Sequence, residues 1–361
     1  MRITFLFPLP NFSGGCRVVA IYAEGLAKKG HEVNILATLP RKRSLLSNVK
    51  RLFKFKKWLK KEADDSILKN SHFCNMKGVD VNFLPSRLSK VTKILPVSDV
   101  IIATWWETAE WLNQVTLGKE KIYYFIQHHE VHSHLPIERV KATYRLPFKK
   151  ITIAQWLVDV MENNYNDKNV SLIPNGVDVT IFNAQARDKQ MTPTFSIMYA
   201  REDFKGTDVS FAAFEYAKKK YPQIKLLVFG AKNIDKNIPL PEGAVFYLAP
   251  KQEKIKEIYS YSDGYIFSSR SEGFGLPVLE AMACRCPVIA TKAGCAPDFI
   301  RHGVNGELNE VDDFEAQGES IIKFIEMNNS DWRNMSEAAH KSVVNNTWEK
   351  SISEFENILS E

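Results

Sequence analysis

Short apolar runs alternate with amphipathic stretches along most of this chain of 361 residues. From the start, an apolar strand at 3–7, a helix that ends near residue 29 and a second strand at 32–37 form one β-α-β unit. Strands that alternate with helices in this way predict a parallel, doubly wound α/β sheet. Further strands of the same sheet are predicted at 79–84, 97–103 and 122–127.

The same alternation begins a second time after the stretch LIPNGVD at 172–178. A chain of this length also exceeds the roughly 250–300 residues at which single cores stop growing. We therefore predict two Rossmann-like domains that face each other across a cleft, with ligands at the carboxyl ends of the strands. The elements predicted in the second series are strands at 195–200, 224–229, 264–267 and 287–290, and helices at 207–220, at 251–260 and from Pro277.

The net charge of +6 is concentrated in one segment, because residues 41–61 hold ten Lys or Arg and no acid. Apolar and aromatic residues recur there at spacings of three or four, which is typical of a helix that lies on an anionic membrane surface. A solvated helix that packs on its own domain is the main alternative. A nucleic-acid arm is disfavoured because the rest of the chain is acidic.

No apolar run reaches the roughly 18 residues that a membrane span requires. The apolar stretch before Pro8 is too short for a signal peptide. The five scattered cysteines suit reduced thiols, so we expect a cytoplasmic protein at the membrane face. Cys284, Cys286 and Cys295 could suggest a metal site, but their apolar surroundings favour buried side chains, and we predict no metal.

Two glycine-containing loops are candidates for anion binding. Gly14 and Gly15 lie between the first strand and its helix, where backbone amides can approach an anion, although a plain turn explains them equally well. Arg201 and Lys205 follow the first strand of the second series and precede a glycine. The forked guanidinium of Arg201 and the compact ammonium of Lys205 at a strand's carboxyl end predict contact with a phosphate. The alternative is that both are ordinary surface charges.

The stretch SRSEGFGLPVLEAM at 269–282 places two carboxylates, Glu272 and Glu280, on either side of a glycine turn. Pro277 suits a first helical turn, so the turn is expected to present amides at a helix start. Carboxylates can accept from paired sugar hydroxyls while the amides hold a phosphate. This pattern predicts a sugar-nucleotide site, with donor contacts from Glu272, Gly273, Phe274, Gly275, Leu276 and Glu280.

Four histidines in FIQHHEVHSH follow a strand of the first domain. Zinc is an alternative for them, but their spacing matches no familiar zinc site. A solvated loop is another interpretation of these histidines, and a role in catalysis is considered below.

The stretch SRSEGFGLPVLEAMACRCPVIATKAG, together with IPNGVDVTIF, REDFKG, GVNGEL and TWEKS, resembles the retaining glycosyltransferases of family 4, in the glycosyl transferases group 1. The resemblance implies the GT-B fold, with an acceptor domain at 1–172, a donor domain at 173–346 and a C-terminal helix at 347–361 that returns to the first domain. It implies a nucleotide-diphosphate sugar as donor, a UDP-sugar being expected, with no required cofactor. Arg285, Cys295 and Asp298 depart from the residues common in the family.

The same resemblance implies roles for individual residues. Glu272 would contact donor hydroxyls and Glu280 the ribose, while Arg201 and Lys205 stabilise the leaving diphosphate. His128, or less favourably His129, would be the catalytic-site histidine near the donor sugar, and Gly14 and Gly15 would form the family's N-terminal loop. We therefore expect a retaining sugar transfer to an acceptor hydroxyl in cell-surface polysaccharide or lipid-linked glycan assembly. A glycosidase, a GT-B nucleotide-sugar epimerase and a non-catalytic sugar-nucleotide binder are the alternatives.

Overall fold

The computed structural model describes residues 1–38, 64–84, 95–114 and 121–361. The predicted basic amphipathic helix at 41–61 lies outside these described residues. Within the described ranges, no helix is long and apolar enough to cross a membrane. The chain forms two compact units: unit 1 is Met1–Thr152, Leu157–Ile173 and Ile352–Glu361, and unit 2 is Ile153–Trp156 and Pro174–Ser351.

Unit 1 is built on a parallel sheet whose described strands follow the order β3-β2-β1-β4-β5-β6-β7. Its central strands β1, β4 and β5 are buried almost throughout, as the continuous apolar runs predict for a sheet covered on both faces. The strands are β1 (Arg2–Phe7), β2 (Glu32–Thr38), β3 (Val79–Leu84), β4 (Val100–Ala103), β5 (Ile122–Ile126), β6 (Lys149–Thr152) and β7 (Val170–Leu172). The helices are α1 (Gly14–Lys28), α3 (Asp64–Lys69), α4 (Trp106–Leu112), α5 (Ile137–Tyr144) and α6 (Gln155–Tyr165).

The C-terminal helix α13 (Trp348–Ser360) contributes its last residues to unit 1. Its apolar face is buried, and the Phe355 ring lies 4.6 Å from the Tyr22 ring and 5.2 Å from the Phe125 ring. Gly25 of α1 allows close packing of the two helices, because a Cβ there would lie only 2.3 Å from Ile352 Cδ1. These buried aromatic contacts hold the last residues of α13 within unit 1.

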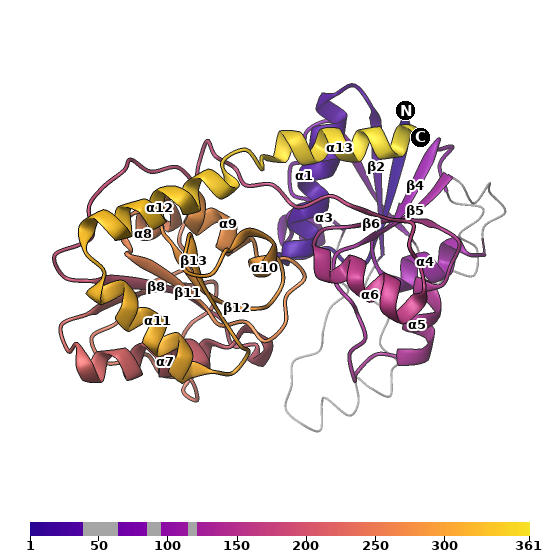
Figure 1. The fold of residues 1–361 in the computed structure, drawn as a ribbon. Helices are drawn as coiled ribbons and strands as arrows, with labels where there is room; N and C mark the ends of the chain where they lie inside the picture. The colour runs from indigo at the N-terminus through magenta and orange to yellow at the C-terminus, as the bar shows by residue number, and fades with distance from the viewer. Residues whose placement is uncertain (39–63, 85–94, 115–120) are drawn as a thin grey trace. The chain divides into compact units, whose positions relative to one another are not determined.

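Unit 2 is a second parallel sheet, with described strands in the order β10-β9-β8-β11-β12-β13. Helices α7 and α11 cover one face and α8, α9 and α12 the other (Figure 1). The strands are β8 (Thr194–Tyr199), β9 (Lys225–Gly230), β10 (Val245–Leu248), β11 (Gly264–Phe267), β12 (Val288–Thr291) and β13 (Gly306–Asn309). The helices are the 3-10 turn η3 (Asp203–Lys205), α7 (Thr207–Lys220), α8 (Gln252–Tyr261), α9 (Leu276–Ala283), α10 (Ala296–Phe299), α11 (Phe314–Glu326) and α12 (Asn329–Val343).

Unit 2 begins and ends at two segments that are hydrogen-bonded to each other. Val177 N–H donates to the Asn346 carbonyl at 2.9 Å, and the Ser351 hydroxyl donates to the Pro174 carbonyl at 2.7 Å. Gly176 permits this close approach, since a Cβ there would meet the backbone nitrogen of Trp348 at 2.3 Å. The two connections of unit 2 therefore run side by side.

Candidate functional site

The carboxyl ends of β8 and β11 bring together two of the predicted site residues. Lys205 lies in η3 after β8, and Glu272 lies in the loop after β11. Lys205 Nζ is 2.6 Å from Glu272 Oε1, and the Ser269 hydroxyl donates to the same oxygen at 3.0 Å. Both side chains are largely buried, at 23% and 10% exposure, so this ion pair is shielded from solvent more than a surface pair.

Close contact between these two loops depends on Gly206. This residue has a φ of +61°, and a Cβ there would lie 1.9 Å from the Ser268 carbonyl oxygen. The main chains are also joined directly, because Arg270 N–H donates to the Phe204 carbonyl at 2.8 Å and Ser271 N–H donates to it at 3.2 Å. Lys205 and Glu272 are thus set by backbone contacts and not only by their own attraction.

The predicted glycine turn precedes α9 as expected. Gly275 adopts the left-handed region, with a φ of +93°, and Pro277 stands in the first turn of the helix. Within the described part of the chain, the N–H groups of Gly273, Phe274 and Gly275 donate to no other protein group. Amides of this kind at a helix start form an electropositive site for an anion.

A second glycine holds the turn from behind. Gly294 has a φ of +59°, and a Cβ there would lie 2.3 Å from the Phe274 carbonyl oxygen. Cys295 N–H donates to the same carbonyl at 2.6 Å. Cys295, which stands where the resembled family commonly has glycine, is fully buried, and burial raises the pKa of its thiol. The departure from glycine therefore places a protonated, apolar-like side chain behind the turn.

Glu280 lies on α9 and is 7% exposed, so it is nearly enclosed within unit 2. Its role as a ribose ligand stays a prediction, as do the roles of the other predicted site residues. Arg201, predicted to share an anion with Lys205, binds a backbone carbonyl in this structure. Its Nε and Nη2 donate to the Asn233 carbonyl at 3.0 and 2.6 Å, and within the described residues no contact joins it to Lys205 or Glu272.

In unit 1, Gly14 and Gly15 begin α1, whose N-cap Ser13 accepts from Cys16 N–H. Gln127, at the carboxyl end of β5, donates from its Nε2 to the Gly15 carbonyl at 3.3 Å. The predicted glycine loop therefore adjoins the segment that carries the histidines.

The two candidate histidines differ in their surroundings. His128 Nδ1 lies 3.0 Å from the His129 carbonyl, and its ring lies 5.3 Å from that of His132. His129 Nε2 is 2.7 Å from the Tyr165 hydroxyl. Burial, and then the neighbouring histidines, lower the pKa of His129 to about 4, so this ring is neutral near pH 7.

Sequence analysis did not single out Glu130 or Arg270. Glu130 lies between His129 and His132 and is buried, accepting from Trp106 N–H at 3.0 Å, and burial raises the pKa of its carboxyl well above the usual range. Arg270 precedes Glu272 by two residues and binds three aspartates, described below. The hint of Glu130 in the sequence is an acid four residues beyond a strand's carboxyl end.

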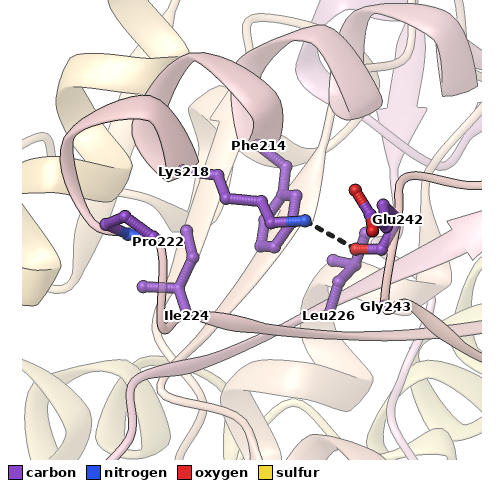
Figure 2. Close-up of a pocket in the computed structure, with 7 residues that line it drawn as sticks. All are labelled: Phe214, Lys218, Pro222, Ile224, Leu226, Glu242 and Gly243. Carbon is purple, nitrogen blue, oxygen red and sulfur yellow. Dashed lines mark hydrogen bonds between the residues drawn. The ribbon is translucent and has the colours of Figure 1, made fainter.

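A hollow of about 340 Å³ in unit 2 lies away from these residues. Figure 2 shows it between the C-terminal half of α7 and the start of β9, where Lys218 donates to the Glu242 carbonyl at 2.6 Å. Ligands of parallel α/β sheets bind at the opposite edge, beyond the carboxyl ends of the strands. The hollow is therefore not the candidate site.

Two parallel α/β sheets, each in a compact unit of its own, are the architecture of the GT-B class. Residues 180–342 match the family model described as glycosyl transferases group 1.

Curated relatives match parts of the chain. N-acetyl-alpha-D-glucosaminyl L-malate synthase of Bacillus anthracis is 38% identical over 118 residues, which cover 32% of this chain and 30% of the relative. The capsular polysaccharide biosynthesis glycosyltransferase CapM of Staphylococcus aureus is 30% identical over 127 residues, covering 34% and 33%. The match thus spans about a third of each of these relatives.

Solved structures match over the whole chain. HepE of Anabaena, in complex with UDP-glucose, has a TM-score of 0.72 at 16% identity and covers 100% of this chain and 99% of its own. Sucrose-phosphate synthase of Thermosynechococcus elongatus has a TM-score of 0.72 at 16% identity, with coverage of 100% and 98%. These likenesses confirm the predicted GT-B fold.

Proposed function

We propose that this protein is a retaining glycosyltransferase that moves a sugar from a nucleotide-diphosphate sugar to an acceptor hydroxyl. The observation that carries the proposal is the Lys205–Glu272 pair beside the N–H groups of Gly273–Gly275, which donate to no group among the described residues. A cation and free amides favour a diphosphate, whereas an adjacent carboxylate favours hydroxyl groups. The match of residues 180–342 to the glycosyl transferases group 1 model supports this assignment.

The donor would be held along the carboxyl edge of the unit 2 sheet. Lys205 and the amides of Gly273–Gly275 and Leu276 would bind the diphosphate, with Arg201 approaching it on release from the Asn233 carbonyl. Glu280 would accept from the ribose hydroxyls. Because Glu272 Oε1 already accepts from Lys205 and Ser269, its other oxygen would bind the sugar hydroxyls.

A UDP-sugar is the proposed donor, taken without a required metal or other cofactor. The structural neighbour HepE was solved with UDP-glucose, which supports uridine as the base. Lys205 supplies positive charge directly where the leaving diphosphate would develop negative charge.

The proposed reaction breaks the bond between the sugar's anomeric carbon and the β-phosphate oxygen, which keeps the electron pair. The acceptor hydroxyl oxygen bonds to the same face of that carbon, and its proton passes to the leaving phosphate, so the anomeric configuration is retained. Lys205 and the helix-start amides stabilise the phosphate during this step. His128, Gly14 and Gly15 belong to unit 1, and their part in the reaction stays a prediction.

The acceptor would be a glycan or a lipid-linked glycan at an anionic membrane surface. The relative CapM is named for capsular polysaccharide biosynthesis, which supports a cell-surface product. The basic segment 41–61 would hold the protein peripherally on the cytoplasmic face. Sedimentation with anionic liposomes at low salt should retain the protein, and neutral liposomes should not; equal recovery from both would exclude this part.

A thermal-shift panel tests the donor site. UDP, GDP, TDP and ADP would be added with and without EDTA to the wild type, to Glu280→Ala and to Glu253→Ala, a control in the first turn of α8. We expect UDP to raise the melting temperature of the wild type and of the control, unaffected by EDTA, and not that of Glu280→Ala. No shift with any nucleotide would exclude the proposal.

Product analysis separates the remaining alternatives. Incubation of a UDP-sugar without acceptor should leave its sugar configuration unchanged, whereas an epimerase would convert it. Release of UDP that depends on an acceptor would exclude a non-catalytic binder. Arg201→Ala is expected mainly to lower kcat, and Glu280→Ala mainly to raise the donor KM.

A further inference from the structure

We propose that Arg270 is a positioning residue that holds Lys205 in place for the donor diphosphate, an inference that rests on the proposed function. Arg270 precedes Glu272 by two residues and lies on the loop after β11. Its side chain binds residues on both sides of Lys205 in the sequence.

The Arg270 guanidinium binds groups on three separate segments. Its Nη1 donates to the Asp203 carbonyl of η3 at 2.6 Å. Nη1 and Nη2 bind the two carboxylate oxygens of Asp208, in the first turn of α7, at 3.0 and 2.7 Å. Nε donates to Asp312, beyond β13, at 2.6 Å. A planar fork is needed for this set, because an ammonium group presents its donors from one point.

These contacts enclose the turn that carries Lys205. Asp203 is two residues before Lys205, and Asp208 is three residues after it. The main chain of Arg270 adds a third link, since its N–H donates to the Phe204 carbonyl at 2.8 Å. One residue thus binds η3 through both its backbone and its side chain, and ties it to the loop of Glu272.

Charge gives the arrangement a second effect. Asp203, Asp208 and Asp312 would place three negative charges beside a site proposed to bind a diphosphate. The Arg270 guanidinium is 22% exposed, and its hydrogen bonds hold the pKa of the Asp208 carboxyl below its usual range. Loss of Arg270 would therefore free Lys205 and also leave these carboxylates uncompensated.

The backbone of Asp312 shows that one partner of Arg270 is held in a costly conformation. It has a φ of +64°, a backbone conformation that costs a non-glycine residue free energy. Its carboxylate nevertheless binds Arg270 Nε. Asparagine tolerates the same conformation, so Asp312→Asn removes the charge without altering the backbone preference.

A double-mutant cycle tests the inference, with UDP affinity measured by calorimetry on the full chain. The variants are Lys205→Ala, Arg270→Gln and their combination, with Arg270→Lys to test the fork. Arg333→Gln is the control, because Arg333 binds Asp188 at 2.6 Å in an exposed ion pair. We expect Arg270→Gln to weaken UDP binding about tenfold, Arg270→Lys to rescue it only in part, and the control to match the wild type.

The combination with Lys205→Ala decides between positioning and general stability. If Arg270 acts through Lys205, Arg270→Gln should cause little further loss of UDP affinity in the Lys205→Ala background. An equal loss in both backgrounds, or no loss in the wild-type background, would overturn the inference. Should Arg270→Gln fail to fold, Arg270→Lys takes its place in the cycle, and a loss of UDP affinity that is equal in the wild-type and Lys205→Ala backgrounds, or absent from the wild-type background, overturns the inference.

Failure of the proposed function gives a different result. A wild type that binds no nucleoside diphosphate would reject the donor site itself. A wild type that binds UDP through Lys205, but is indifferent to Arg270, would reject only the role of Arg270.

Discussion

Substitution of Gly206 by alanine, compared with the same substitution at Gly243, should separate the free-energy cost of a left-handed backbone from the cost of a steric clash. Gly206 has a left-handed φ of +61°, and its missing Cβ leaves room for the Ser268 carbonyl oxygen. Gly243 has a similar φ of +79°, but a Cβ there would meet nothing within 4 Å. The two variants therefore share the backbone penalty and differ in the steric one.

The magnitude follows from these surroundings. Alanine in the left-handed region costs about 1 kcal/mol, which is the whole loss expected for Gly243→Ala. At Gly206 the Cβ would lie 1.9 Å from a backbone oxygen. Ser268 is buried, and its hydroxyl is fixed by Ser210 at 2.7 Å and Gln317 at 2.6 Å, so its backbone has little freedom to retreat. Overpacking of this kind adds about 1–3 kcal/mol.

Native-state hydrogen exchange of the amides in β11 and α7 would measure the free energy of opening of unit 2 in both variants. Gly206→Ala should lower the free energy of opening by about 2–4 kcal/mol, against about 1 kcal/mol for Gly243→Ala. UDP affinity should fall in Gly206→Ala alone, because the clash with the Ser268 carbonyl pushes the two loops apart and moves Lys205 away from Glu272. Equal losses of protection in the two variants would refute the steric argument, and retained UDP affinity would refute its link to the site.

Three further changes test the packing and the pH response of the two units. Gly25→Ala should loosen the C-terminal helix and increase hydrogen exchange of its amides, because the new Cβ would clash with Ile352 Cδ1. Adding Ile352→Val removes that Cδ1 and should partly restore protection from exchange; equal exchange in the double and single variants would contradict this. Arg285 has a φ of +59°, so Arg285→Gly should be about 1 kcal/mol more stable to urea than Arg285→Ala, and the reverse order would show that the backbone conformation is unimportant. The pKa of His129 is lowered to about 4 from 6.5, so the unfolded chain binds more protons between these values and stability falls as the pH drops through them. Between pH 7.5 and 5 the wild type should lose free energy of unfolding, measured by urea or thermal unfolding, and His129→Gln should make that loss about 1 kcal/mol smaller. An equal loss in both proteins would reject the lowered pKa of His129.

The apolar runs predicted the central strands of both sheets within a few residues of their observed ends. Four strands were missed: β6, β7, β10 and β13. In β6, Lys150 is buried and ion-paired with Asp167 at 2.5 Å, and in β13, Glu307 is buried and paired with Lys323 at 2.6 Å. Each charge is neutralised by a partner 16 or 17 residues away, which hydrophobic periodicity does not detect. Strand β10 lies at the sheet edge, is only four residues long and is partly exposed, so it offers only a short apolar run for sequence analysis to detect.

The candidate site was predictable only where its residues are close in sequence. The glycine turn at 273–275 before α9 could be placed, because glycine and proline restrict the backbone locally. The partner of Lys205 could not, since Glu272 is 67 residues away and meets it through the approach of two loops. Arg201 was predicted from its residue type and spacing; its guanidinium binds the Asn233 carbonyl, and its role stays a prediction. Arg270 was missed because its three aspartate partners lie 42 to 67 residues away in the sequence.

The paired connections at Gly176 make unit 2 an insertion held at both ends. A single proteolytic cut in either connection would leave unit 2 covalently attached through the other. The hydrogen bond from Val177 to Asn346 would also keep the cut segment in place. Limited proteolysis should therefore nick the chain, visible on a denaturing gel, before any native fragment separates, and a side chain at Gly176 would part the two segments and speed that release.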